Sequence, residues 1–143
     1  MVSPLLGGGL QMGAGLSLEN LRLDLSAVEK EIMSFIRCCV EEAGATGVVI
    51  GLSGGVDSST VAHLSVKALG SDRVFALILP STTTAKQDVE DAKRVAESLG
   101  ISYEVIEITL IEEAFAKVCP RFDETNLVAV GNLKPRIRMM TLY

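Results

Sequence analysis

The chain has 143 residues, which is enough for one domain with a hydrophobic core. Its formal net charge is -5 and its pI is about 4.9, and no basic block occurs, so the composition argues against a nucleic-acid-binding groove. The three cysteines, Cys38, Cys39 and Cys119, are an odd number without metal-ligand spacing. They predict reduced thiols and a cytoplasmic protein.

The first 24 residues differ from the rest because glycine and leucine dominate them. The glycines interrupt the continuous apolar stretch that a secretory signal or a membrane span needs. We therefore expect a flexible tail over residues 1–24, no membrane segment, and one folded domain over residues 25–143.

Within residues 25–143, hydrophobic periodicity switches repeatedly between the spacing of helices and that of strands. A capping box at Ser26–Glu29 marks the first helix start, and Thr84 and Thr109 are expected to cap two later helices. The predicted elements are a helix from Ser26 to Gly44, a strand over 47–52, a helix over 57–69, a strand over 73–79, a helix from Thr84 to Gly100, a strand over 102–108, a short helix from Thr109 to about Cys119, and a last helix or pair of helical turns over 127–143.

Strands that alternate with helices predict an α/β fold, in which a parallel sheet carries helices on both faces. Right-handed crossovers place the N-termini of the helices at the carboxyl edge of such a sheet. Ligands bind at this edge in open α/β sheets.

The most informative segment is the glycine-rich stretch over residues 51–59, which joins the first predicted strand to the next helix. Backbone N–H groups at such a turn converge with the helix dipole on one anion-binding position. We expect Gly54 and Gly55 to lack side chains where a phosphate approaches the backbone, and Asp57 to offer a carboxylate to magnesium. The stretch lacks the Gly-Lys-Ser/Thr ending of a kinase-type phosphate loop and the spacing of a dinucleotide turn.

A second informative stretch, residues 131–140, gathers three cations within five residues. Asn132 is expected to cap a helix there, which would place Pro135 in its first turn. Arg136 and Arg138 are two residues apart and therefore point in different directions, so one can face a ligand while the other pairs with protein carboxylates. An arginine fork suits phosphate recognition.

The Ser-Gly-Gly-Val-Asp-Ser pattern of residues 53–58 resembles the pyrophosphate loop (PP-loop) of the ATP pyrophosphatases, which cleave ATP between its α and β phosphates. This loop, the Leu79-Pro80-Ser81 segment, the Glu90-Asp91-Ala92 helix and the Gly-Asn-Leu-Lys-x-Arg-x-Arg-Met run over 131–139 together resemble ammonia-dependent NAD synthetase. The resemblance covers roughly residues 25–143. It implies a Rossmann-like fold of the adenine nucleotide alpha-hydrolase type, and an ATP-binding PP-loop domain over 25–143.

The resemblance also implies a function, which is the ATP-dependent amidation of deamido-NAD to NAD by ammonia. The reaction would pass through an adenylated intermediate and release AMP and pyrophosphate. The family is homodimeric, so a homodimer is expected. In this family Asp57 would bind Mg²⁺, Leu79 would lie near the adenine, Arg136 would contact deamido-NAD, and ATP would be bound by Gly51, Leu52, Ser53, Gly54, Gly55, Val56, Asp57 and Ser58.

Two features depart from the family pattern. Family members usually have alanine at the position of Pro135, and they continue for roughly as long again beyond the Arg-x-Arg-Met run. The chain is therefore interpreted as the amino-terminal, truncated half of such an enzyme. Two alternatives stay open: an ATP-binding fragment that is catalytically incomplete, and another ATP pyrophosphatase such as a GMP-synthetase-like amidating enzyme.

Overall fold

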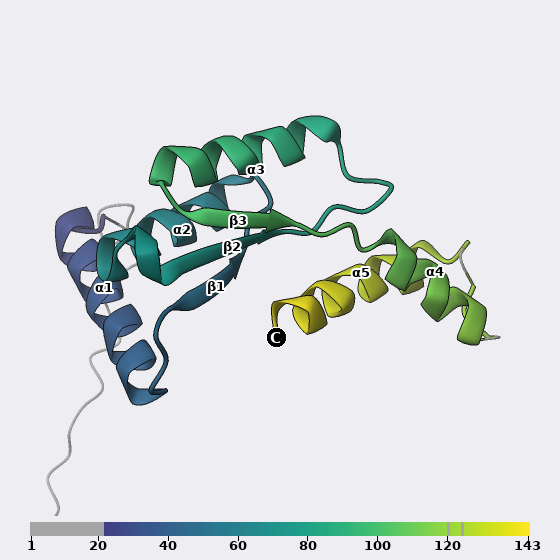
Figure 1. Ribbon diagram of the computed structural model, residues 1–143, viewed down its shortest axis with the longest axis horizontal. Helices are drawn as coiled ribbons and strands as arrows, with labels where there is room; N and C mark the ends of the chain where they lie inside the picture. Colours follow the sequence, from purple (N-terminus) through teal and green to yellow (C-terminus); the bar gives the residue numbers. More distant parts are fainter. Residues whose placement is uncertain (1–21, 120, 124) are drawn as a thin grey trace, which may run out of the picture.

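The computed structural model describes residues 22–119, 121–123 and 125–143, and these form a three-stranded sheet flanked by helices (Figure 1). The strand order is β1-β2-β3, and both neighbouring pairs are parallel. The elements in chain order are α1 (Leu25–Glu42), β1 (Val48–Gly51), α2 (Val56–Leu69), the 3-10 helix η2 (Ser71–Arg73), β2 (Val74–Ile78), α3 (Lys86–Leu99), β3 (Ser102–Val105), α4 (Thr109–Val118) and α5 (Leu127–Leu142).

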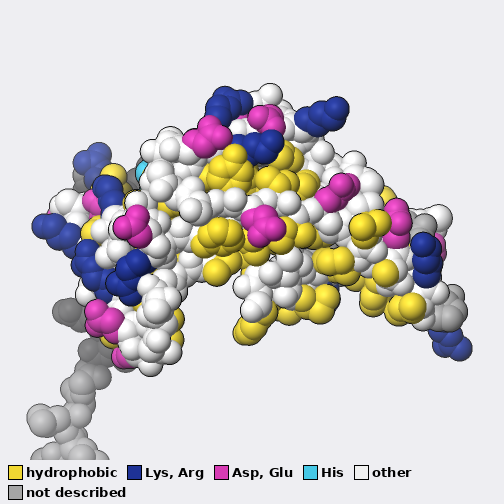
Figure 2. Space-filling view, in the orientation of Figure 1, with side chains coloured by type: hydrophobic (Ala, Val, Ile, Leu, Met, Phe, Trp, Pro, Cys, Tyr) yellow, Lys and Arg dark blue, Asp and Glu magenta, His cyan; other side chains and the backbone are white. Residues whose placement is uncertain are grey.

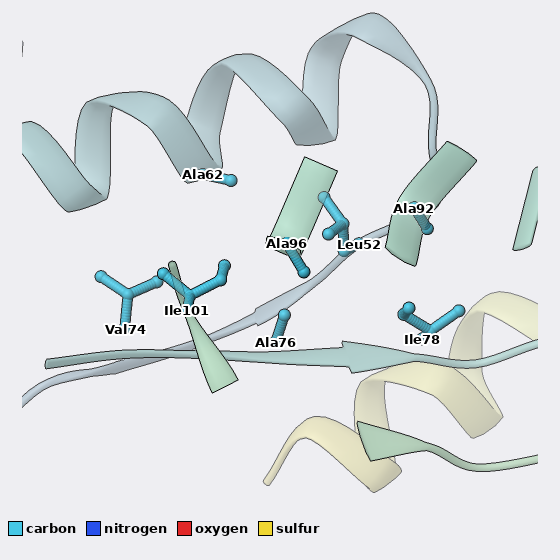
Figure 3. Packing of buried hydrophobic residues seen from close by; sticks show 8 residues of the cluster. All are labelled: Leu52, Ala62, Val74, Ala76, Ile78, Ala92, Ala96 and Ile101. Carbon is cyan, nitrogen blue, oxygen red and sulfur yellow. The ribbon is translucent and has the colours of Figure 1, made fainter. Parts of the chain in front are cut away.

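One face of the sheet carries α2 and α3 and forms the larger hydrophobic core (Figure 3). Three of its eight buried residues are alanines on these helices, and such small side chains let a helix approach the strands closely. Acidic and basic side chains gather on the outer side of α3 (Figure 2), where they form the ion pairs Lys93–Glu90 and Arg94–Asp91. The core members are Leu52, Ala62, Val74, Ala76, Ile78, Ala92, Ala96 and Ile101.

The opposite face is covered by α5 near the carboxyl ends of the strands (Figure 1). A second cluster of four buried residues, Leu77, Leu79, Ile108 and Ile137, joins this helix to the sheet. Toward the amino ends of the strands this face is more open, and Val49 remains 51% exposed. Helices therefore lie on both faces of a parallel sheet, which confirms the fold class predicted from the alternation of strands and helices.

Several element boundaries follow the sequence signals closely. α1, α2 and α3 end next to Gly44, Gly70 and Gly100, as predicted. Within the part of the chain that the structure describes, no helix is long and apolar enough to cross a membrane.

The predicted helix caps were mostly wrong. α1 is capped by Asp24, whose Oδ1 accepts from the backbone N–H groups of Ser26 and Ala27 at 3.0 and 3.2 Å. A hydrogen bond from the Ser26 hydroxyl, together with these two from the backbone, lowers the pKa of the Asp24 carboxyl. Asp and Ser are about equally favoured as caps, so the capping box alone did not show that the helix begins two residues earlier and that Ser26 lies inside its first turn. Of the predicted tail, residues 1–21 lie outside the described residues, while Asp24 belongs to the first helix.

The threonines expected to cap α3 and α4 are engaged elsewhere. Thr84 Oγ1 accepts from the N–H of Ser81 at 2.9 Å inside the loop, and the N-cap position of α3 is Ala85. Thr109 donates its hydroxyl to Glu107 at 2.9 Å, and α4 begins without a side-chain cap. In each case a hydrogen bond to a neighbouring residue occupies the hydroxyl that was expected to cap the helix.

The last helix begins earlier than the Asn132 cap predicted. Asn126 caps α5 by accepting from the N–H groups of Val128 and Ala129, both at 3.1 Å. Asn132 lies inside the helix and donates to the carbonyl of Val128 at 2.9 Å. Pro135 consequently sits in the helix interior, where it offers no N–H to the carbonyl of Gly131.

We expect Pro135→Ala to stabilise the protein. The substitution restores an intrahelical donor and removes the clash of the ring with the preceding turn, against a smaller loss from the more flexible unfolded chain. The net gain in the free energy of unfolding should be about 2 kcal/mol, measured by urea denaturation followed by far-UV circular dichroism. A variant no more stable than the parent would show that α5 tolerates the proline without strain.

Candidate nucleotide-binding site

The glycine-rich loop lies at the carboxyl edge of the sheet, as predicted. The N–H of Leu52 donates to the carbonyl of Leu77 at 2.9 Å and extends the pairing of β1 with β2 by one residue. The chain then leaves the sheet, turns through residues 53–55 and enters α2 at Val56. The parallel strands place this turn beside the loop that follows β2.

Three serines brace the loop internally. Ser58 donates its hydroxyl to the carbonyl of Gly55 at 3.1 Å, so in its 3.0 Å contact with Ser53 it must be the acceptor. Its oxygen also accepts from the N–H of Ser53 at 3.2 Å, while the N–H of Gly55 donates to the Ser53 hydroxyl at 3.4 Å. Ser59 donates to the same Gly55 carbonyl at 2.8 Å. These bonds hold the turn through groups of the loop itself.

The two central glycines differ in what surrounds them, while the phosphate contact expected at both stays a prediction. Gly54 has a φ of 82°, and a Cβ built on it would lie 2.5 Å from the carbonyl oxygen of Asp88 in α3. Its missing side chain therefore serves the packing of the loop on α3. Gly55 has an ordinary φ of -76°, and a Cβ there would meet only the Ser53 hydroxyl, at 3.5 Å. Only Gly55 leaves open space beside the loop.

The first turn of α2 offers unpaired donors next to this space. Gly55 is the N-cap of α2 and provides no side-chain cap, so the N–H groups of Val56, Asp57 and Ser58 have neither a capping side chain nor an intrahelical partner. The first turns of α1 and α5 are capped by Asp24 and Asn126, whereas α3 and α4 also start without a side-chain cap. What sets α2 apart from α3 and α4 is that its start follows the glycine loop. An uncapped helix start carries a positive dipole end that suits a phosphate.

Asp57 is exposed in this first turn. Among the described residues no group of three or more His, Cys, Asp or Glu side chains could hold a metal ion, so the chain offers no dedicated metal cage there. Mg²⁺ commonly binds one or two carboxylates together with substrate phosphates and water. A single accessible carboxylate beside a phosphate-binding turn fits that donor set.

A cavity of about 820 Å³ opens next to the loop, between the sheet edge and α5. This volume lies in the range of small-molecule sites. Of the predicted ATP-binding residues, Gly51, Leu52, Ser53 and Leu79 line the cavity, whereas residues 54–58 continue from it toward the start of α2. The remaining lining residues are Leu77, Ile78, Pro80, Thr83, Thr84, Asp88, Val89, Pro135, Arg138, Met139, Leu142 and Tyr143.

The structure separates the two arginines of α5. Arg136, the predicted substrate residue, is exposed, donates Nη1 to the carbonyl of Asn132 on its own helix at 2.6 Å, and does not line the cavity. Arg138 is half-buried, lines the cavity, and donates Nε to the carbonyl of Leu79 at 3.1 Å. The role predicted for Arg136 stays a prediction.

Sequence reasoning did not assign Arg138 to the site, although a signal for it exists. The cavity-lining residues of α5 recur at positions i, i+3, i+4 and i+7, which is the spacing of one helix face. This spacing places Arg138 on the same stripe as three apolar side chains and leaves Arg136 off it. The stripe consists of Pro135, Arg138, Met139 and Leu142.

Comparison with known proteins agrees with this geometry. The family model described as NAD synthase matches residues 28–143. The chain belongs to the NAD synthase family. An NH(3)-dependent NAD(+) synthetase from Archaeoglobus fulgidus is 54% identical over 122 residues, an alignment that covers 85% of this chain and 48% of the relative. The chain spans about half the length of the curated relatives it matches.

Two solved structures superimpose on the chain. One is an NH3-dependent NAD synthetase from Campylobacter jejuni, with a TM-score of 0.76 and 40% identity, covering 85% of this chain and 51% of that one. The other is an NMN synthetase from Francisella tularensis, with a TM-score of 0.77 and 38% identity, covering 85% and 50%. The family and the fold inferred from the glycine loop and the 131–139 run are thereby confirmed.

Proposed function

We propose that this chain provides the ATP-binding part of an ammonia-dependent NAD synthetase, which converts deamido-NAD to NAD. The observation that carries the proposal is an internally braced glycine loop, opening on an uncapped helix start and a cavity, in a chain 54% identical to an NH(3)-dependent NAD(+) synthetase. The alignment covers 85% of the chain, which favours this reaction over that of a more distant ATP pyrophosphatase.

The arrangement suits transfer of AMP to a carboxylate. The carboxylate of deamido-NAD attacks the α phosphorus of ATP, the bond to the pyrophosphate breaks, and ammonia then displaces AMP to form the amide. The backbone N–H groups of Val56, Asp57 and Ser58 would receive the phosphate oxygens that gain charge as pyrophosphate leaves. Mg²⁺ held at Asp57 would neutralise part of that charge.

The remaining residue roles follow from position. Leu52 and Leu79 present apolar surface to the cavity and would contact the adenosine part of ATP. The outward position of Arg136 supports a contact with an acceptor that binds outside the cavity. Ammonia as nitrogen donor, a homodimeric assembly and a cytoplasmic location are part of the same proposal.

Product analysis tests the reaction. The 143-residue protein is incubated with Mg²⁺, ATP and an ammonium salt, and each of three acceptors is supplied separately: deamido-NAD, its mononucleotide counterpart and xanthosine monophosphate. The mononucleotide is included because a structural relative is an NMN synthetase. We expect NAD and AMP to form in equal amounts with deamido-NAD, measured by chromatography.

Three results would change the proposal. AMP formation that depends on xanthosine monophosphate and not on deamido-NAD would contradict it and favour a GMP-synthetase-like enzyme. ATP binding, measured by calorimetry, without NAD formation would favour the catalytically incomplete ATP-binding module. Faster turnover of the mononucleotide than of deamido-NAD would identify a different acceptor for the same type of reaction.

A further inference from the structure

The end of β2 shows how Arg138 is held. Carbonyl groups along a strand point alternately to its two sides, and here each of four consecutive carbonyls has a partner. Three accept from backbone N–H groups: Leu77 from Leu52, Ile78 from Ile106, and Pro80 from Ile108, each at 2.9 Å. The fourth, the carbonyl of Leu79, accepts from Nε of Arg138 at 3.1 Å.

The missing backbone donor has a simple cause. Leu77 bonds toward β1 and Ile78 toward β3, so Leu79 points again toward the side of β1. The chain has already left the sheet after Leu52 to form the glycine loop, and no strand residue is present to donate. Arg138 enters from α5 and replaces that donor. Its side chain is therefore fixed in the gap between the loop and the extension of β2.

Only one of the five donors of the guanidinium group is used in this way. In the described part of the chain Arg138 forms no ion pair and no hydrogen bond other than the one from Nε. Asp88 and Arg138 contribute the charged side chains among the cavity-lining residues. A half-buried guanidinium with unused N–H groups, in a cavity shared with a phosphate-type loop, has the charge and the donor geometry that bind an anion.

We propose that Arg138 binds a phosphate group of ATP through its Nη groups, while the Leu79 carbonyl fixes the orientation of the guanidinium through Nε. This inference rests on the proposed function, since it requires ATP in this cavity. It makes α5 a wall of the nucleotide site and gives Leu79 two roles, an apolar contact through its side chain and a positioning contact through its carbonyl.

Three variants test the inference. Arg138→Gln removes the charge and the fork, and Arg138→Lys keeps the charge without the Nε donor. The matched control is Arg37→Gln, because Arg37 also donates Nε to a backbone carbonyl, that of Ala68 at 2.8 Å, but lies on α1 and does not line the cavity. Isothermal titration calorimetry of each protein with Mg²⁺ and ATP gives the dissociation constants, and competition against ATP gives those for adenosine.

We expect Arg138→Gln to weaken ATP binding about 10- to 100-fold, Arg138→Lys to recover part of the loss, and Arg37→Gln to stay within about twofold of the parent. Adenosine should bind the parent and Arg138→Gln equally, because it has no phosphate. Equal losses for ATP and adenosine would assign Arg138 a purely structural role and overturn the inference. ATP binding by the parent with no effect of Arg138→Gln would overturn it and leave the proposed function intact, whereas a parent that binds no ATP would overturn both.

Discussion

Replacing Gly54 with alanine is expected to lower the free energy of unfolding by about 3 kcal/mol or more. A non-glycine residue at a φ of 82° costs about 1–2 kcal/mol. The new Cβ would also lie 2.5 Å from the carbonyl oxygen of Asp88, and relief of that overlap requires the loop to move away from α3 at a cost of about 1–3 kcal/mol. Small domains have only about 5–15 kcal/mol in total, so the loss would be readily measured by urea denaturation.

Gly55→Ala is the control for this prediction, because it adds the same methyl group one residue later. Gly55 has an allowed φ of -76°, and its new Cβ would lie 3.5 Å from the nearest atom, the Ser53 hydroxyl. We expect its free energy of unfolding to fall by about 1 kcal/mol or less, because Gly55 is the N-cap of α2 and alanine is less favourable than glycine there. Equal stability of the two variants would show that the loop does not depend on close packing against α3.

The second large effect is expected at Asp57. Asp57→Asn should weaken the binding of ATP about tenfold or more when Mg²⁺ is present, because the neutral amide is a poor ligand for this ion. With EDTA in place of Mg²⁺ the variant should bind ATP at least as tightly as the parent, since a negative charge beside the phosphates has been removed. The effect of the substitution therefore reverses when the metal is removed.

Asp72→Asn is the matched control, because Asp72 is also an exposed aspartate, on η2 between α2 and β2. Calorimetric titrations of parent and variants, each with and without Mg²⁺, provide the comparison. The dissociation constant of Asp72→Asn for ATP should equal that of the parent both with and without Mg²⁺. If Mg²⁺ tightened the binding of ATP to Asp57→Asn as much as it does for the parent, another group would have to hold the metal.

Much of the fold could be predicted because its signals are local. The apolar run before Gly51 and the helical pattern after Ser58 fix a strand, a turn and a helix, and the alternation of such units fixes a parallel sheet. Gly70 and Gly100 mark helix ends through backbone geometry that needs no tertiary contact. The family could be recognised for the same reason, because the loop and the 131–139 run are each an unbroken stretch of sequence.

The parts that sequence reasoning missed depend on contacts between distant residues. Asn126 and Asn132 are equally good caps by type, and the helix begins at the first of them. The choice between Arg136 and Arg138 depends on which face of α5 meets the Leu79 carbonyl. The role of Gly54 depends on α3, more than thirty residues further along the chain.

The domain boundary at residue 25 and the residue roles in ATP and substrate binding remain predictions. Their shared basis is that the backbone amides of the glycine loop and of the α2 start hold the phosphates of ATP. Resonance assignments of the ¹⁵N-labelled 143-residue protein, titrated with Mg²⁺ and ATP, test this basis directly. We predict that the largest amide shifts fall on residues 53–58, with smaller shifts around the cavity at Leu79 and Thr83. Unchanged signals over residues 53–58, or shifts gathered at the opposite edge of the sheet around residues 71–73, would contradict the account.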